Sequence, residues 1–377
     1  MKREQKKDQN SRRELSAEER MYMASQWRLM ARRFFRHKIA VSALAVLGIF
    51  YILAIFCPFF APYGKNQRLK GYIHAPPHKV HFVDESGEFH LRPFVYPHKQ
   101  ELNEETLSRN YTPDKSEKHF LKFFVEGKPY TMLGIIKSRT HFIGTEKGKF
   151  LLFGADEMGR DLFSRILFGA RVSLTIGLVG VFLALVLGTI MGGISGYYGG
   201  KPDMLIQRVI EFIMSIPAIP FWMALSAALP PTWSVIMVYF AITVILSLRR
   251  WCGIARVVRG KFLQLREEDF VVAAKAAGAS ESRIMFVHMV PSFLSWIIVR
   301  ATIMIPGMII AETGLSFLGL GIRPPAVSWG ALLKSAQNVQ NVLMYPWILI
   351  PGIFVVIAVL AYNFVGDGLR DAADPYQ

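Results

Sequence analysis

Three histidines, His74, His78 and His81, lie close together in the segment HAPPHKVH. Imidazole nitrogens are common ligands of zinc and nickel, so a metal site is the first chemistry to consider. The two prolines in the segment disfavour a helical i, i+4 pair of ligands, and no acidic or cysteine ligand is adjacent. We therefore predict that these residues form no metal site.

Patterns for nucleotide binding and catalysis are also missing. A phosphate-binding loop needs the spacing G-x-x-x-x-G-K-[ST], and the segments GIIKS and EKGKF do not have its glycines. No Ser/His/Asp, Cys/His or paired-carboxylate arrangement with a plausible pocket is visible. We predict that the chain has no catalytic residue, binds no cofactor and is not an enzyme.

Two charged residues belong to an apolar segment at 292–316, which we expect to span a membrane. A charge at such a depth usually faces a partner or a water-filled path. Arg300 could line a pathway, pair with a carboxylate or snorkel, and Glu312 could line an entrance near the outer end. Arg208 and Glu211, three residues apart, are expected to pair locally.

Gly188, Gly192 and Gly196 form a G-x-x-x-G-x-x-x-G row within another apolar segment. Such a row lets a second helix approach closely. It could serve as a gate, as a seam with another protein, or as packing within the chain.

The elements that carry these residues must be membrane helices. The 377 residues are 52% hydrophobic, and a net charge of +16 is concentrated in loops beside long apolar runs. A span needs about 20 apolar residues, and residues 39–60 provide an uncharged one. The polar region 1–38 and the length of this run do not fit a cleaved signal peptide. Cys57 lies within the first expected span and Cys252 in a basic loop far along the chain, so we expect no disulfide between them.

We predict an all-α integral membrane protein with six transmembrane helices. The spans are expected at 39–60, 172–198, 205–229, 233–248, 292–316 and 343–365. The basic region 1–38 includes an amphipathic stretch suited to the cytoplasmic membrane surface. Lys and Arg crowd the loop 249–291 and are sparse at 317–342. By the positive-inside rule, both termini and the loop 249–291 are cytoplasmic, and nucleic acid is not the expected partner.

Residues 61–153 differ in kind from the rest. Short β-prone runs such as KVHFV and FHLRPFVY alternate with turn segments such as DESGE and TPDKSEK. We expect an extracytoplasmic loop or small β-rich domain inserted after the first helix. A core with five transmembrane helices would then occupy 154–377.

The segment VVAAKAAGAS lies in the basic loop and consists largely of small residues. Glu267, Glu268 and Asp269 favour a helix N-terminus, and Gly278 is a suitable C-terminal stop. Ala274 and Gly278 are four residues apart, so one helix face is nearly bare. A bare face lets another protein surface approach closely, although alanine also simply favours helix.

This loop resembles the cytoplasmic signature of ATP-binding-cassette importer permeases, in which Glu-Ala-Ala is followed by a spaced Gly and Pro. Ala273, Ala274, Gly278 and Pro291 occupy the matching positions, and Val272 stands where the family has Glu. Three more stretches resemble the C-type subunit of the dipeptide/oligopeptide/nickel branch. They are GADEMGRDLFSRILFGARVSL (154–174), GGKPDMLIQRVIEFIMSIP (199–217) and AETGLSFLGLGIRPPAVSWG (311–330).

The resemblance implies a type I ABC importer permease fold in the bacterial cytoplasmic (inner) membrane, surrounded by membrane lipid. Its implied partners are a second homologous permease, two ATPase subunits that use ATP and Mg²⁺, and an extracytoplasmic solute-binding protein. The helix around Ala273 and Gly278, with Val272, would couple ATP hydrolysis by the ATPases to alternating access. The implied cargo is oligopeptides or dipeptides.

Two other functions remain open at this stage. The same fold could import nickel or another small solute, which the external histidines favour and the long first loop disfavours. A membrane scaffold or channel without ATP coupling is a different class, and the coupling signature argues against it.

Overall fold

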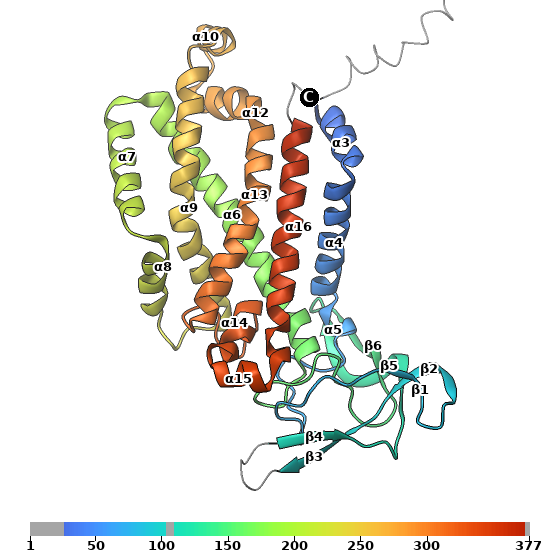
Figure 1. Cartoon of the computed structure of the whole chain (residues 1–377). Coiled ribbons are helices and arrows are strands. Elements are labelled where there is room, and N and C mark those ends of the chain that lie inside the picture. Colours follow the sequence, from blue (N-terminus) through green and yellow to red (C-terminus); the bar gives the residue numbers. More distant parts are fainter. Residues whose placement is uncertain (1–25, 103–108, 374–377) are drawn as a thin grey trace, which may run out of the picture.

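The computed structural model describes residues 26–102 and 109–373, and long helices dominate it (Figure 1). Five helices are long and apolar enough to cross a membrane, or six if one bent pair counts as a span. The long helices are α4 (Lys38–Ile55), α6 (Leu162–Tyr198), α9 (Val235–Leu265), α13 (Leu294–Phe317) and α16 (Ile350–Ala373). The expected all-helical membrane fold with a β insertion is therefore confirmed.

The bent pair consists of α7 (Gly200–Ser215) and α8 (Ala218–Ala227), which meet at an angle of 89°. We expected one continuous span at 205–229. Pro217 restricts the residue before it to extended backbone, and Ile216 accordingly has φ −85° and ψ 129°. The helix therefore ends at Ser215 and a new one begins after Pro217.

Helix α9 is longer than the sequence suggested. The expected span ended at residue 248, yet the helix continues through the basic segment to Leu265. Apolar residues recur there at helical spacing and are buried, namely Trp251, Ile254, Ala255, Val258 and Phe262. This buried stripe makes the segment helical despite its charges, so the first part of the predicted loop 249–291 is a helix.

Outside residues 103–108, the insertion after α4 and the short α5 (Cys57–Phe60) has six strands in the described chain. A four-stranded antiparallel sheet has the order β1-β2-β5-β6, and β3 and β4 form a separate hairpin. In the hairpin, Lys99 lies opposite Thr112 and Glu101 opposite Asn110. The strands are β1 (His81–Val83), β2 (Phe89–Val95), β3 (His98–Leu102), β4 (Arg109–Pro113), β5 (His119–Met132) and β6 (Ile136–Thr145).

Short helices complete the two ends of the bundle. They are α3 (Gln26–Arg36), α10 (Asp269–Ala276), α11 (Glu281–Arg283), the π-helix η1 (Ile284–Met289), α12 (Val290–Ser292), α14 (Trp329–Leu333), the 3-10 helices η2 (Lys334–Gln337) and η3 (Pro346–Leu349), and α15 (Val339–Met344). Helices α3 and α10 lie at the end where α16 finishes, whereas α14, α15 and the β insertion lie at the opposite end (Figure 1). Cys57 and Cys252 are both buried and free.

Candidate functional site

Helix α10 is a short helix with a well-formed stop. Its C-terminal turn is closed by two backbone hydrogen bonds, from Gly278 N–H to Lys275 O (3.0 Å) and from Ala279 N–H to Ala274 O (3.1 Å). Gly278 adopts φ +78°, a left-handed conformation that favours glycine at the end of a helix. The sequence predicted both the helix and this stop.

The surface of α10 is largely unoccupied. Val271 is its one buried residue, and Ala274 packs partly against the main core. Val272 is 55% exposed, and Ala273, Ala276 and Gly278 are exposed as well. The helix protrudes beyond the ends of α9 and α13 (Figure 1), so small side chains line a projecting surface.

The region that follows α10 is tied back to the long helices. The Tyr198 hydroxyl at the end of α6 donates to the Glu281 carboxylate of α11 (2.8 Å). Pro291 is the second residue of α12 and is exposed. Of the five residues expected to act in coupling, Val272, Ala273, Ala274 and Gly278 lie together, whereas Pro291 lies beyond η1, closer to α13.

The predicted glycine row faces α9 of the same chain. A Cβ atom added at Gly192 would lie 2.5 Å from the carbonyl oxygen of Ala255, and one at Gly196 would lie 2.6 Å from that of Arg259. At Gly188 the same atom would meet the Ile254 side chain at 2.6 Å. The row therefore lets α6 and α9 approach closely along their length.

A buried carboxylate holds α6, α13 and the following loop together. Glu312 is fully buried and accepts hydrogen bonds from Ser173 (3.1 Å) and Ser316 (2.6 Å). The Ser173 hydroxyl in turn accepts a hydrogen bond from the backbone N–H of Trp329 (3.1 Å). Glu312 thus lies inside the bundle, among hydroxyl groups of its own chain.

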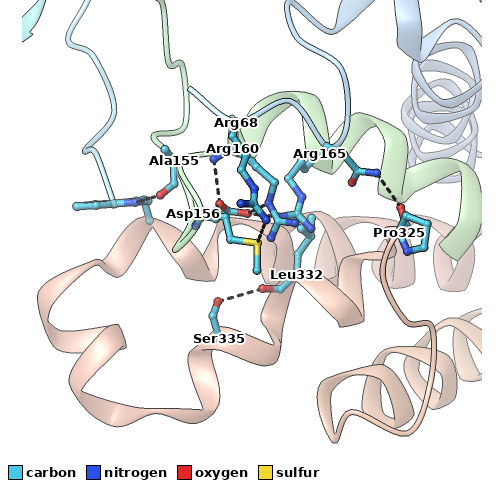
Figure 2. Close-up of polar contacts among 11 residues, drawn as sticks. Arg68, Ala155, Asp156, Arg160, Arg165, Pro325, Leu332 and Ser335 are labelled. Carbon is cyan, nitrogen blue, oxygen red and sulfur yellow. Dashed lines mark hydrogen bonds and ion pairs between the residues drawn. The ribbon is translucent and has the colours of Figure 1, made fainter. Parts of the chain in front are cut away.

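A polar cluster surrounds the start of α6 at the end that carries the insertion (Figure 2). The Asp156 carboxylate accepts from Arg160 Nε (2.8 Å) and forms a buried ion pair with Arg165. It also accepts from the backbone N–H groups of Met158 (2.9 Å) and Arg160 (3.0 Å). A cavity of about 660 Å³ adjoins this cluster, with Arg68, Arg323 and Lys334 on its wall.

A second ion pair joins α7 to α9 near the α10 end. The Arg259 guanidinium donates to both oxygens of Asp203, each at 2.6 Å. The Ser195 hydroxyl of α6 also binds Asp203. Sequence reasoning missed Asp156 and Asp203, although both lie within stretches singled out for their resemblance.

The three histidines of the HAPPHKVH segment contact different neighbours. His74 stacks on Tyr345 and His78 on His98, each with ring centroids 4.0 Å apart, and His81 packs against Phe94. Burial, followed by the neighbouring His98, lowers the pKa of His78 to about 3. Asp84, Glu88 and His90 are close enough to share a cation, but Lys118 already pairs with the Asp84 carboxylate. The Lys118 side chain thus supplies the positive charge beside Asp84.

Arg300 lies on α13 beside a smaller cavity of about 240 Å³. Its side chain is exposed. The cavity lies at the break between α7 and α8 and has Arg249 and Arg250 of α9 on its wall. The sequence did not reveal that these three arginines converge.

Comparison with known proteins identifies the sequence family. The family described as binding-protein-dependent transport system inner membrane component matches residues 184–376. The N-terminal transmembrane domain of oligopeptide transport permease C matches residues 25–77. On either side of the β insertion, these two matches cover the first span and the part of the bundle from residue 184 onward.

Individual relatives agree with this assignment. The oligopeptide transport system permease protein OppC of Haemophilus influenzae is 42% identical over 224 residues, which cover 59% of this chain and 70% of the relative. OppC of Bacillus subtilis is 36% identical over 241 residues, 63% of this chain and 76% of the relative. The dipeptide transport system permease protein DppC of Alkalihalophilus pseudofirmus is 42% identical over 224 residues, covering 59% of this chain and 71% of the relative.

A solved structure of the MetNI methionine ABC transporter in an inward-facing conformation is 19% identical, with a TM-score of 0.44 over 57% of this chain and 99% of that chain. The family match extends over half of the sequence and includes α9, α10 and α13. The chain therefore belongs to the family of inner membrane components of binding-protein-dependent transport systems and is a permease subunit of an ABC importer.

Proposed function

We propose that this permease subunit imports oligopeptides or dipeptides. The observation that carries the proposal is the 42% identity to permeases named for oligopeptide and dipeptide transport. The match to the N-terminal domain of oligopeptide transport permease C supports it at the first span.

The proposed complex contains a second homologous permease, two ATPase subunits and an extracytoplasmic binding protein. In it, α10 lies in the cytoplasm and the β insertion outside, which agrees with the basic residues of 249–291. The domains are then a cytoplasmic region 1–38, a first span at 39–60, an extracytoplasmic region 61–153 and a permease core 154–377. Both termini are cytoplasmic, and the membrane is the bacterial inner membrane.

Coupling proceeds through the exposed surface of α10. The partner ATPases bind ATP and Mg²⁺ and close on each other. Helix α10 moves with them because its small side chains allow close contact. A conformational change of this kind needs contacts that differ between the two states. The Tyr198–Glu281 hydrogen bond (2.8 Å) and the close packing of α6 on α9 provide routes from α10 into the bundle.

The remaining expected site residues receive narrower roles. Gly188, Gly192 and Gly196 act as the seam that holds α6 against α9, since each faces α9. Glu312 acts as a positioning residue, because its carboxylate is satisfied by Ser173 and Ser316. Val272 contacts the ATPase through apolar surface, where a Glu would add a charge.

Uptake by a reconstituted complex tests this function. The permease is assembled in liposomes with its partner permease, the two ATPases and the binding protein, and labelled trialanine and Ni²⁺ are offered in separate assays. We expect ATP-dependent uptake of trialanine and none of Ni²⁺. Uptake of Ni²⁺ without peptide would establish the nickel alternative, and uptake that needs no ATP would contradict the importer assignment.

A further inference from the structure

The cavity of about 240 Å³ beside the α7–α8 break is lined by hydrogen-bond donors. Arg249, Arg250 and Arg300 carry positive charge, and Trp222 adds an indole N–H. The other lining residues are Met214, Ala218, Gly253 and Met304. Among the described residues on this wall there is no carboxylate, hydroxyl or amide side chain, so the cavity has donors without a matching acceptor.

Two of these donors are buried and unpartnered. Within residues 26–102 and 109–373, neither Arg250 Nε nor Trp222 Nε1 has a hydrogen-bond partner. Arg249 differs, because it donates to the carbonyls of Ile213 (3.1 Å) and Ile216 (2.6 Å) at the end of α7. Buried polar groups are normally hydrogen-bonded, so the free donors of Arg250 and Trp222 point to a ligand with acceptor atoms.

The Arg250 wall of the cavity lies near the middle of α13 along its length. A Cβ atom added at Gly307 would lie 2.6 Å from a terminal nitrogen of Arg250, so the guanidinium rests on α13 at Gly307. That residue is near the middle of α13 (Leu294–Phe317), roughly 20 Å from its start at about 1.5 Å per residue. A cation at this depth is beyond easy reach of lipid headgroups and needs a polar path or an anion.

The start of α8 adds positive potential at one side of the cavity, while the carbonyls at the end of α7 accept from Arg249. Ala218, the first residue of α8, lines the cavity, and no side chain caps that helix N-terminus. A helix N-terminus favours negative charge, and discontinuous helices of transporters direct such ends at anionic substrate groups. Irregular backbone inside a membrane is tolerated where it lines a water-filled cavity. Helix α8 and the two arginines thus favour the same kind of ligand.

We propose that this cavity binds the C-terminal carboxylate of the transported peptide during its passage. The proposal rests on the peptide function proposed above. The planar guanidinium of Arg250 matches the two carboxylate oxygens, Arg300 adds charge at the mouth, and Trp222 N–H supplies a third donor. Met214 and Met304 provide flexible apolar surface that adapts to different C-terminal side chains.

The test compares trialanine with its C-terminal amide, which lacks the negative charge. Binding of each is measured by calorimetry on the purified permease pair without the binding protein, and ATP-driven uptake of each is measured in the full reconstituted complex. Arg250→Gln removes the guanidinium charge and its Nε donor, and Trp222→Phe removes the indole N–H donor. Arg208→Gln, an exposed arginine that pairs with Glu211 (2.8 Å), is the matched control.

For Arg250→Gln we expect the preference for acid over amide to fall roughly tenfold, the lower end of the effect of a hydrogen bond to a charged group. Trp222→Phe should reduce the preference for acid less than Arg250→Gln does. Arg250→Lys should keep part of the preference that Arg250→Gln loses. The Arg208→Gln control should match the wild type. An unchanged preference in Arg250→Gln would overturn the proposal.

A second result would also overturn the proposal: the Arg250→Gln permease no longer assembles with its partner permease, while Trp222→Phe keeps the preference for acid. That result would assign Arg250 to a carboxylate of the partner permease. Failure of the proposed function is separate, because it would appear as absent trialanine uptake in the wild-type complex.

Discussion

The two ends of helix α6 are held in opposite ways. At its start, Asp156 gathers Arg160 and Arg165 into a buried cluster (Figure 2). At its other end, glycines seat α6 against α9, Ser195 binds the Asp203 carboxylate that pairs with Arg259, and one exposed hydrogen bond reaches Glu281 of α11. The buried ion pair ties the start of α6 to the preceding loop, whereas α10 has Val271 as its one buried residue and is held by few contacts. This difference supports the proposal that the insertion end is the anchored one and that α10 moves with the ATPases.

The largest expected effect comes from breaking the anchored end. In Asp156→Asn, the buried Arg165 guanidinium loses its charged partner, and removal of one member of a buried ion pair costs about 3–5 kcal/mol. Thermal unfolding in detergent should show a large loss of stability. Glu157→Gln, an exposed neighbour, should unfold like the wild type, and equal stability of both variants would show that Asp156 is no anchor.

A smaller effect is expected at the α6–α9 seam. In Gly192→Ala the new methyl group would meet backbone atoms of Ala255 at 2.5 and 2.9 Å, and overpacking of this kind costs about 1–3 kcal/mol. The matched variant Gly260→Ala adds its methyl group in open space and should leave stability the same or higher. If both variants melt at the same temperature, the glycine row is not a packing seam.

The β insertion should respond to acid. Burial lowers the pKa of His78 to about 3 and also lowers that of His98, whereas an unfolded histidine has a pKa near 6.5. Below pH 6.5 the unfolded chain therefore binds protons that the folded insertion does not, and stability falls as pH decreases toward 3.

Amide hydrogen exchange of β1 and β2 should accelerate between pH 6.5 and 4.5, after correction for intrinsic exchange rates. Lys118 holds the pKa of Asp84 well below its usual range, so that carboxylate stays ionised in this window. His78→Gln should flatten the response, and an equally steep response in that variant would assign it to other groups.

The sequence predicted features that depend on local patterns. Apolar runs located the spans, and acidic residues before VVAAKAAGAS with Gly278 after it located α10. The break between α7 and α8 also has a local cause, Pro217. An estimate from the length of the apolar run alone does not take this residue into account. Helix α9 was underestimated because charges at 249–266 concealed a buried stripe that is visible in its 3.6-residue spacing.

Contacts between distant segments were beyond the reach of local patterns. Arg250 and Arg300 belong to different helices, and nothing near either residue indicates that they share a cavity. Asp156 and Arg165 are nine residues apart across a loop and a helix start, a spacing with no standard pairing rule. Such pairs follow from the packing of whole helices, which a single sequence does not specify.

Substitution on the exposed surface of α10 tests most directly the proposal that this helix moves with the ATPases. Ala273→Trp fills the surface, Ala273→Ser keeps it small, and both are assembled with partner permease, ATPases and binding protein in liposomes. The measurement is trialanine imported per ATP hydrolysed, together with the melting temperature of the permease. We predict that Ala273→Trp lowers this ratio, or the amount of bound ATPase, about tenfold with no change in melting temperature, while Ala273→Ser behaves as wild type. An unchanged ratio with full ATPase binding in Ala273→Trp would contradict a coupling role for α10.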